Sequence, residues 1–214
     1  MTRIVCISDT HGKRLGREGI PIPDGDVLIH AGDLTETGQI AQVQSALTQI
    51  TALPHPYKVI IAGNHDFLFE RFPSLARDMV GKAGITYLED SEVTLAGLRI
   101  YGSPWQPWFY DWAFNGPHGG SLMDKWNRIP QGLDILITHG PPKGVCDWIP
   151  KQNQGVGCEE LRMRIEETSP RLHVCGHIHE GYGEGQIGPT RVVNASLLDG
   201  RYAAVNKPII IDLP

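Results

Sequence analysis

The fold class of this chain is decided by one stretch, Val59-Ile60-Ile61-Ala62-Gly63-Asn64-His65-Asp66. Its first four residues form an apolar run, typical of a buried β-strand, and the run stops at a glycine. An amide, an imidazole and a carboxylate then follow in a row. Polar side chains at the end of a buried strand cost free energy unless they bind something. We therefore expect a functional site where this strand ends.

Four more apolar segments end in the same way. They lead into Asp9-Thr10-His11, into Gly32-Asp33, into His139-Gly140 and into Gly176-His177-Ile178-His179. In open α/β sheets, ligands bind outside the carboxyl ends of the strands, so these side chains can meet at one place. A single histidine after a strand is more often structural than functional, but five such strand ends are hard to explain by packing. We interpret the whole set as one site.

The side chains of this set predict a metal centre. The candidate ligands are two aspartates, one asparagine and four histidines: Asp9, His11, Asp33, Asn64, His139, His177 and His179. Carboxylates and neutral imidazoles suit borderline divalent ions, and this set is too large for one tetrahedral zinc. Two ions about 3.5–4 Å apart can hold a bridging water as hydroxide and clamp a phosphoryl group. We expect two divalent ions, with Mn²⁺ as first choice and Fe²⁺ or Fe³⁺, Zn²⁺, Co²⁺ or Ni²⁺ as alternatives.

The remaining pattern predicts an α/β chain with two packed sheets. Predicted strands cover residues 3–8, 26–31, 58–62, 85–88, 92–95, 98–101, 133–138, 171–175, 191–193 and 209–211. Predicted helices cover residues 40–53, 74–82, 121–127 and 157–168. The run of strands from residue 85 to 101 departs from simple βαβ alternation, which favours two packed sheets over one doubly wound sheet. No helix follows the glycines between residues 181 and 188, so we place them in a loop and a hairpin.

Length and composition limit the class of protein. The chain has 214 residues, 41% of them hydrophobic, which fits a single domain spanning residues 1–214. No apolar run reaches the ~18 residues of a membrane span, and the N-terminus leads straight into a strand. We therefore expect a cytoplasmic protein that binds no membrane. The net charge of −5 argues against long nucleic acid as a partner. The oligomeric state, monomer or homodimer, stays open.

Two further groups of residues need an interpretation. The aromatic segment from Trp105 to Phe114 forms either a satellite core under a long loop or a substrate mouth that stacks on a base or aryl group. We expect His30, which precedes its turn, to be packed beside the site rather than to act as a ligand. We expect reduced, buried thiols at the four cysteines, which form no C-x-x-C pair: Cys6, Cys146, Cys158 and Cys175.

The motifs resemble a known superfamily. Five blocks follow the order of the calcineurin-like metallophosphoesterases: Asp9-x-His11, Gly32-Asp33, Gly63-Asn64-His65-Asp66, His139 and Gly176-His177-x-His179. Other blocks are similar to the metallophosphoesterase-domain-containing (MPPED) subfamily: Trp105-Gln106-Pro107-Trp108-Phe109, Ile137-Thr138-His139-Gly140-Pro141-Pro142, His177-Ile178-His179-Glu180-Gly181-Tyr182-Gly183 and Asn194-Ala195-Ser196. The similarity extends over nearly the whole chain. It implies a calcineurin-like α/β fold, a central two-sheet β-sandwich flanked by α-helices (αββα).

The resemblance also implies how the ligands divide between the ions. One group holds the first metal, namely Asp9, His11 and His179. A second group holds the other metal, namely Asn64, His139 and His177. Asp33 bridges both ions. Some members of the subfamily carry glycine at the position of His177, so the full set here implies firmer binding of the second metal.

Two more residues receive catalytic roles from the resemblance. His65 lies beside the scissile phosphate, contacts an oxygen and protonates the leaving group. Asp66 orients His65 through its other ring nitrogen, the usual way in which a catalytic imidazole is fixed. Asn64 and His65 are the implied substrate-binding residues.

The implied activity is phosphodiester hydrolysis by attack of a metal-bridging hydroxide. The expected substrates are small: 2′,3′- or 3′,5′-cyclic nucleotides and aryl phosphodiesters. Two alternatives remain, namely hydrolysis of a phosphomonoester or phosphoprotein at the same site and a catalytically silent binding scaffold. The intact ligand set counts against the scaffold. The chain lacks the Gly-x-Ser-x-Gly elbow of serine hydrolases and the Gly-x4-Gly-Lys motif of P-loop enzymes.

Overall fold

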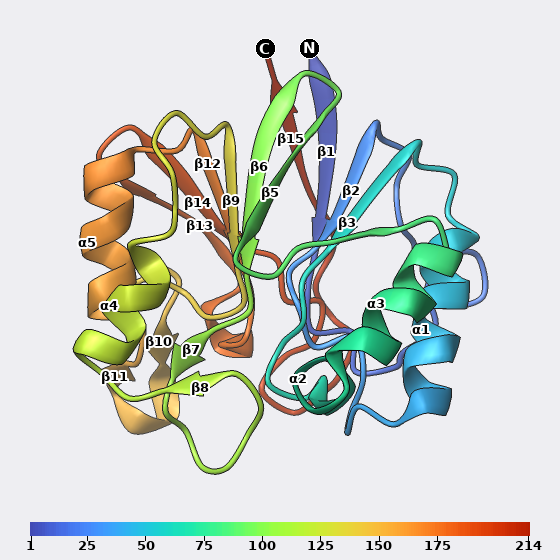
Figure 1. Ribbon diagram of the computed structural model, residues 1–214, viewed down its shortest axis with the longest axis horizontal. Coiled ribbons are helices and arrows are strands. Elements are labelled where there is room, and N and C mark those ends of the chain that lie inside the picture. Colours follow the sequence, from blue (N-terminus) through green and yellow to red (C-terminus); the bar gives the residue numbers. More distant parts are fainter.

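Two β-sheets pack face to face in the computed structural model, which describes residues 1–214, and helices cover both outer faces (Figure 1). The first sheet has the order β15 (Ile209–Leu213), β1 (Thr2–Ile7), β2 (Val27–His30), β3 (Tyr57–Ile60) and β4 (Thr86–Tyr87). The second has the order β13 (Gly183–Ile187), β14 (Thr190–Asn194), β12 (Leu172–Cys175), β9 (Ile135–Thr138), β6 (Leu98–Ser103) and β5 (Ser91–Leu95). The expected αββα sandwich is confirmed.

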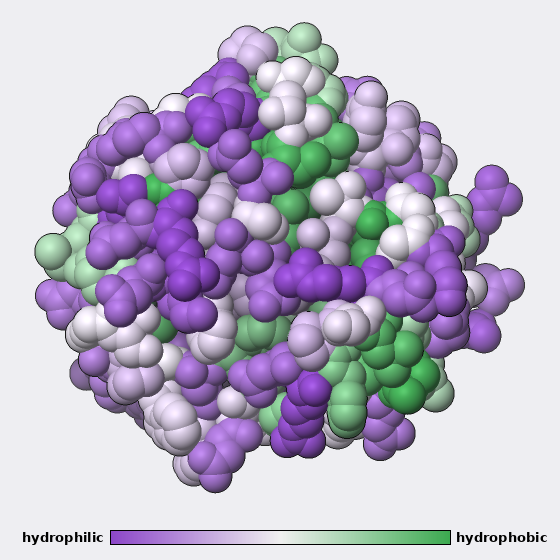
Figure 2. Space-filling view, viewed as in Figure 1, coloured by the Kyte–Doolittle hydropathy of each residue, from purple (hydrophilic) through white to green (hydrophobic).

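The helices divide between the two outer faces. On the first sheet lie α1 (Ile40–Thr51), α2 (Phe67–Arg71) and α3 (Pro73–Lys82), whereas α4 (Gly120–Trp126) and α5 (Glu159–Thr168) cover the second sheet (Figure 1). Hydrophilic residues cover most of the face drawn in Figure 2, and hydrophobic residues appear there in separate patches. No helix of the structure combines the length and the apolar character that crossing a bilayer requires.

The central strands of both sheets are parallel. β1, β2, β3 and β4 run in one direction, as do β14, β12, β9 and β6, while β15, β13 and β5 run antiparallel at the edges. The carboxyl ends of the parallel strands therefore gather along one side of the sandwich, the lower side in Figure 1. This side is where a ligand site is expected in an α/β protein.

Three apolar layers explain why the strands are almost continuously hydrophobic. In β1, Ile4 and Cys6 point between the sheets, while Val5 and Ile7 point toward the layer that contains α1 and α3. Leu136 of β9 lies in the third layer, against α4 and α5. A strand that is covered on both faces shows no polar alternation, so periodicity alone does not reveal which residue points to which layer.

Most predicted elements are present, with boundaries shifted by a few residues. Of the glycines between 181 and 188, Gly183 and Gly185 lie in β13, which forms a hairpin with β14 as expected, and Gly181 and Gly188 lie outside it. The sequence prediction missed α2, the two-residue pairs β7 (Gln106–Pro107) with β8 (Asn115–Gly116) and β10 (Trp148–Ile149) with β11 (Gln154–Gly155), and the 3₁₀ turns η1 (Pro150–Gln152) and η2 (His179–Gly181). Such elements are too short to show a hydrophobic period.

Candidate metal centre

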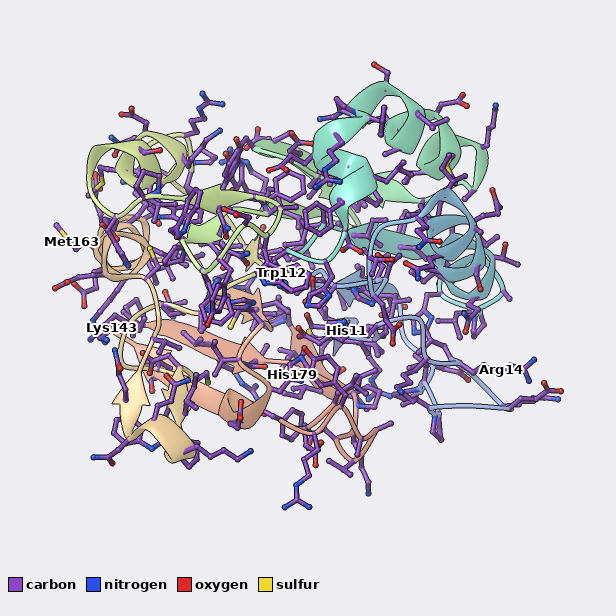
Figure 3. The ribbon with its side chains drawn as sticks, turned by 90° about the horizontal axis from the view of Figure 1, so that it is seen from below. His11, Arg14, Trp112, Lys143, Met163 and His179 are labelled. Atoms are coloured by element: carbon purple, nitrogen blue, oxygen red, sulfur yellow. The ribbon has the colours of Figure 1, made fainter.

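The residues that follow β1, β2, β3, β9 and β12 meet at the carboxyl edge of the two sheets. Figure 3 looks onto this edge and shows His11 and His179 near the middle of the molecule. Six of the predicted ligands are buried and His177 is half-buried. The structure thus brings together all seven side chains that the sequence pattern singled out: Asp9, His11, Asp33, Asn64, His139, His177 and His179.

The first part of the cluster contains Asp9, His11 and His179. The Nε2 atoms of the two histidines face each other at 3.3 Å. The Nε2 atom of His179 also lies 3.4 Å from Oδ1 of Asp9. Two metal ligands at about 2.1 Å from one ion and at right angles are themselves ~3 Å apart, so this spacing suits a shared ion.

The second part is built around the side-chain oxygen of Asn64. This Oδ1 atom lies 2.9 Å from Nε2 of His139 and 2.9 Å from Nδ1 of His177. Asp33 connects the two parts, because its Oδ2 atom lies 3.4 Å from Nε2 of His139 and 3.6 Å from Nε2 of His11. One carboxylate between two ligand groups is the arrangement that a bridged pair of ions needs.

Backbone carbonyls fix the direction of two imidazoles. Nδ1 of His139 lies 2.9 Å from the carbonyl oxygen of Ala31, and Nδ1 of His179 lies 3.0 Å from that of Asp199. A carbonyl only accepts, so Nδ1 carries a proton in both rings and Nε2 is directed into the cluster. This outer bond is the usual device that prepares a histidine for metal binding.

The local backbone is strained at four of the predicted ligands. Asp9, His11, Asp33 and His177 have positive φ angles of 53°, 43°, 56° and 66°. Residues other than glycine rarely adopt this left-handed region, and such strain is concentrated at functional sites. Here it turns each side chain sharply at a strand end, toward the side of the sandwich where the other ligands lie.

Glycines supply the space for these carboxylates. A Cβ atom on Gly176 would lie 2.1 Å from Oδ2 of Asp9, and one on Gly63 would lie 2.3 Å from Oδ1 of Asp33. The backbone N–H of His177 donates to both carboxylate oxygens of Asp9 at 3.0 Å. The backbone therefore approaches both aspartates so closely that only glycine fits at positions 176 and 63.

The electrostatics of the cluster favour bound cations. Burial alone raises the pKa of Asp33, but the charge and hydrogen bond of His139 outweigh it and hold the pKa below the ordinary value. Burial lowers the pKa of His139, yet the carboxylate of Asp33 raises it to about 9. The site thus stabilises positive charge beside its aspartates. Metal ions can replace the protons, because a ligating imidazole is neutral. The donor set, spacing and charge all fit two divalent ions.

His65 faces the cluster, but Asp66 does not orient it. Nδ1 of His65 lies 2.7 Å from the backbone carbonyl of Glu36, and Nε2 lies 4.0 Å from Oδ2 of Asp33. The expectation that Asp66 fixes the His65 ring is therefore wrong. Sequence reasoning could not find Glu36, because the contact uses its backbone rather than its side chain.

Asp66 instead joins the two loops that carry Asp33 and Asn64. Its buried carboxylate accepts from the backbone N–H groups of Gly63, Leu34 and Thr35 at 2.8, 3.1 and 3.0 Å. It also accepts from Oγ1 of Thr35 at 2.7 Å. Burial and the nearby charge of Asp33 raise its pKa to about 6, against the lowering effect of these hydrogen bonds. A short side chain with so many local donors has no free lone pair directed at the His65 ring.

Residues outside the motifs are placed as expected in most cases. His30 is buried and its Nε2 atom lies 2.9 Å from Oγ1 of Thr10, so it packs beside the site. Burial lowers its pKa to about 4. Three of the four cysteines are buried and Cys146 is half-buried.

The cluster opens into a cleft of about 720 Å³. The residues of the aromatic segment divide between core and cleft: Phe114 is buried in the core, whereas Trp108, Phe109 and Trp112 line the cleft. Stacking of these rings on a base or aryl group stays a prediction. Tyr202 was not anticipated from the sequence. It also lines the cleft, and its ring centre lies 4.9 Å from those of both His11 and His179. No motif marks it, because it lies in the loop after β14, which contains none of the predicted ligands.

The fold and the site together define a metal-dependent phosphoesterase. The sequence profile described as Calcineurin-like phosphoesterase matches residues 2–181. Metallophosphoesterase domain-containing protein 1 from Homo sapiens, like that from Mus musculus, is 50% identical over 235 residues, covering 100% of this chain and 71% of its own length. The chain belongs to the calcineurin-like phosphoesterase family and is a phosphoesterase hydrolase.

Solved structures show the same fold at low identity. One superimposes with a TM-score of 0.69 at 16% identity and covers 90% of both chains. The structure of a protein from Thermus thermophilus superimposes with a TM-score of 0.61 at 14% identity, covering 90% of this chain and 88% of the other. These similarities concern the arrangement of the elements alone.

Proposed function

We propose that the chain hydrolyses small phosphodiesters, with cyclic nucleotides and aryl phosphodiesters as substrates. The observation that carries this proposal is the composition of the cleft beside the cluster. Lys143 is the one lysine in its lining and no arginine lies there, whereas Glu159, Glu160 and Glu180 do. A diester carries a single negative charge. A phosphomonoester dianion, a phosphoprotein or a nucleic-acid strand would be repelled more strongly by such a wall.

The residues of the cluster would hold two divalent ions, with Mn²⁺ as our first choice. Asp9, His11 and His179 would bind one ion. Asn64, His139 and His177 would bind the other, and Asp33 would contact both. When bound, the two ions supply an activated water and neutralise the charge of the phosphoryl oxygens.

His65 supplies the proton for the leaving group in this proposal. Its Nδ1–H donates to the Glu36 carbonyl, which leaves Nε2 on the side of the cluster, 4.0 Å from Oδ2 of Asp33, as the atom that would carry the proton for the leaving group. As the oxygen of water bonds to phosphorus, the ester P–O bond breaks and the departing oxygen takes the proton from Nε2. A proton of the attacking water is released and restores the proton on Nε2. An aryl diester yields a phosphomonoester and a phenol, whereas a cyclic nucleotide opens to a single phosphomonoester that carries the new hydroxyl group. A positioned acid of this kind contributes typically 10²–10⁴-fold to a rate.

The test is a panel of substrates assayed with the metal-loaded protein. We expect bis(4-nitrophenyl) phosphate and cyclic nucleotides to be hydrolysed faster than 4-nitrophenyl phosphate. The variant His65→Ala should lose roughly 10²-fold or more in kcat while its metal content is unchanged. Faster turnover of the monoester would identify a phosphomonoesterase. If metal-loaded protein bound these compounds without turnover, the chain would be a binding scaffold.

A further inference from the structure

The imidazole of His65 is held by one hydrogen bond and by stacking. The Glu36 carbonyl fixes the position of Nδ1, at 2.7 Å. A single bond leaves the ring some freedom to rotate about the Cβ–Cγ bond, because the χ2 torsion of histidine has only broad minima. The direction of Nε2, the atom that faces the cluster, therefore depends on what contacts the faces of the ring.

Trp112 provides that contact. Its indole lies 4.1 Å from the His65 ring between centroids, and the two planes are inclined by 32°. The rings of His11 and His65 make an edge-to-face contact with a centroid distance of 4.6 Å and an interplanar angle of 88°. The indole is itself stacked on Phe67 of α2, at 5.8 Å and 30°. Trp112 thus fills the space between α2 and the imidazole.

The loop that carries Trp112 is tied to the site. The next residue, Ala113, donates its backbone N–H to the carbonyl oxygen of Asn64 at 3.1 Å. The backbone N–H of Phe114 donates to Oε1 of Glu70 in α2 at 2.7 Å. A displacement of this loop would consequently move the indole relative to both Asn64 and His65. Figure 3 shows Trp112 close to His11 in the view onto the site.

We propose that Trp112 is a positioning residue for His65, which it holds in the plane where Nε2 reaches the leaving oxygen. This inference rests on the proposed function of His65. Aromatic stacking is the restraint that converts one flexible hydrogen bond into a fixed orientation. Removing it leaves the imidazole in place but lets Nε2 swing, and a misplacement of about 1 Å can cost on the order of 10² in rate.

The test compares variants with diesters whose leaving groups range from 4-nitrophenol to more basic phenols. We expect Trp112→Ala to lower kcat roughly 10-fold or more, with a deficit that grows as the leaving group becomes more basic. The kcat of Trp112→Phe, which keeps a flat ring, should lie between that of Trp112→Ala and that of the native protein. Tyr110→Ala is the matched control, since Tyr110 is an exposed aromatic residue of the same loop that does not line the cleft. Its turnover should equal that of the native protein.

A double-mutant cycle separates positioning from a structural role. In a His65→Ala background, Trp112→Ala should lower kcat no further, because no imidazole is left to position. Metal content and thermal unfolding are measured for every variant. If Trp112→Ala lost its metal ions, the comparison would move to Trp112→Leu, which keeps bulk without a flat ring.

Three results for Trp112→Ala would overturn the assignment. These are a change in KM alone, an equal loss of kcat for all leaving groups, and an undiminished loss of kcat in the His65→Ala background. Full activity of His65→Ala itself would instead refute the proposed function, and with it the reason to position the ring.

Discussion

Replacing Gly63 by alanine should damage the metal centre while leaving most of the fold intact. The φ angle of Gly63 is not positive, so the backbone itself accepts alanine. The obstacle is space. A Cβ atom there would lie 2.3 Å from Oδ1 and 2.4 Å from the backbone nitrogen of Asp33, and 2.7 Å from Cε1 of His139.

The size of the effect follows from these distances. Ordinary contacts of a Cβ atom begin near 3.4 Å, so Asp33 or the glycine loop must move by about 1 Å. Metal sites tolerate deviations of about 0.2 Å in the metal–ligand distances. A shift several times larger should weaken metal binding at least as much as loss of a hydrogen bond to a ligand does, about 10–100-fold. Overpacking should also destabilise the protein by about 1–3 kcal/mol. Turnover should fall by roughly 10².

Equilibrium dialysis against Mn²⁺ and urea unfolding of the metal-free protein measure the two effects separately. Gly81→Ala is the matched control, because a Cβ atom on Gly81 in α3 meets nothing within 4 Å. It should bind metal normally and gain about 0.4–1 kcal/mol in stability. Native metal affinity and turnover in Gly63→Ala would refute the reasoning that close backbone packing places Asp33.

Other predictions concern the metal, Asp66 and the buried His173. Chelation should abolish diester hydrolysis and lower the unfolding temperature, and Mn²⁺ should restore both; activity that survives with less than one ion per chain would contradict this. Asp66→Ala leaves the N–H groups of Gly63, Leu34 and Thr35 without their acceptor. It should lower the free energy of unfolding, measured in urea, by about 3 kcal/mol or more. A loss of turnover at native stability would instead show that Asp66 acts on His65. Burial lowers the pKa of His173 to about 3, so the unfolded chain binds its proton first and stability falls as pH drops below about 6.5. His173→Leu should therefore flatten the acid side of the stability curve by up to about 1.4 kcal/mol per pH unit, and an unchanged slope would show that the group titrates normally.

Much of the fold could be read from local sequence because its strands are short and apolar on both faces. β1, β2, β3, β9 and β12 each end at a glycine or a sharp polar turn, which marks their carboxyl ends. Their pairing order could not be derived in this way. β15 lies next to β1 although the two are separated by nearly the whole chain, and no periodicity specifies a partner.

The site shows the same difference between what the local sequence reveals and what it does not. The chemistry of Asp9, Asp33 and the histidines is visible in the motifs, since few other reasons place such residues after buried strands. The contacts that orient them are not visible. Glu36, Asp199 and Ala31 act through backbone carbonyls, whose identity leaves no trace in the side-chain pattern.

By itself, the sequence determined which atoms are available for metal binding and at which strand ends they stand, because residue type and hydrophobic period are local properties. Only the tertiary structure decided which neighbour each atom meets. Asp66 accepts hydrogen bonds from the backbone N–H groups of Leu34 and Thr35 instead of from an imidazole, and Trp112 packs on the ring of His65. Both outcomes depend on how β2, β3 and the loop after β7 approach one another, and the free energy of that packing is summed over residues far apart in the chain.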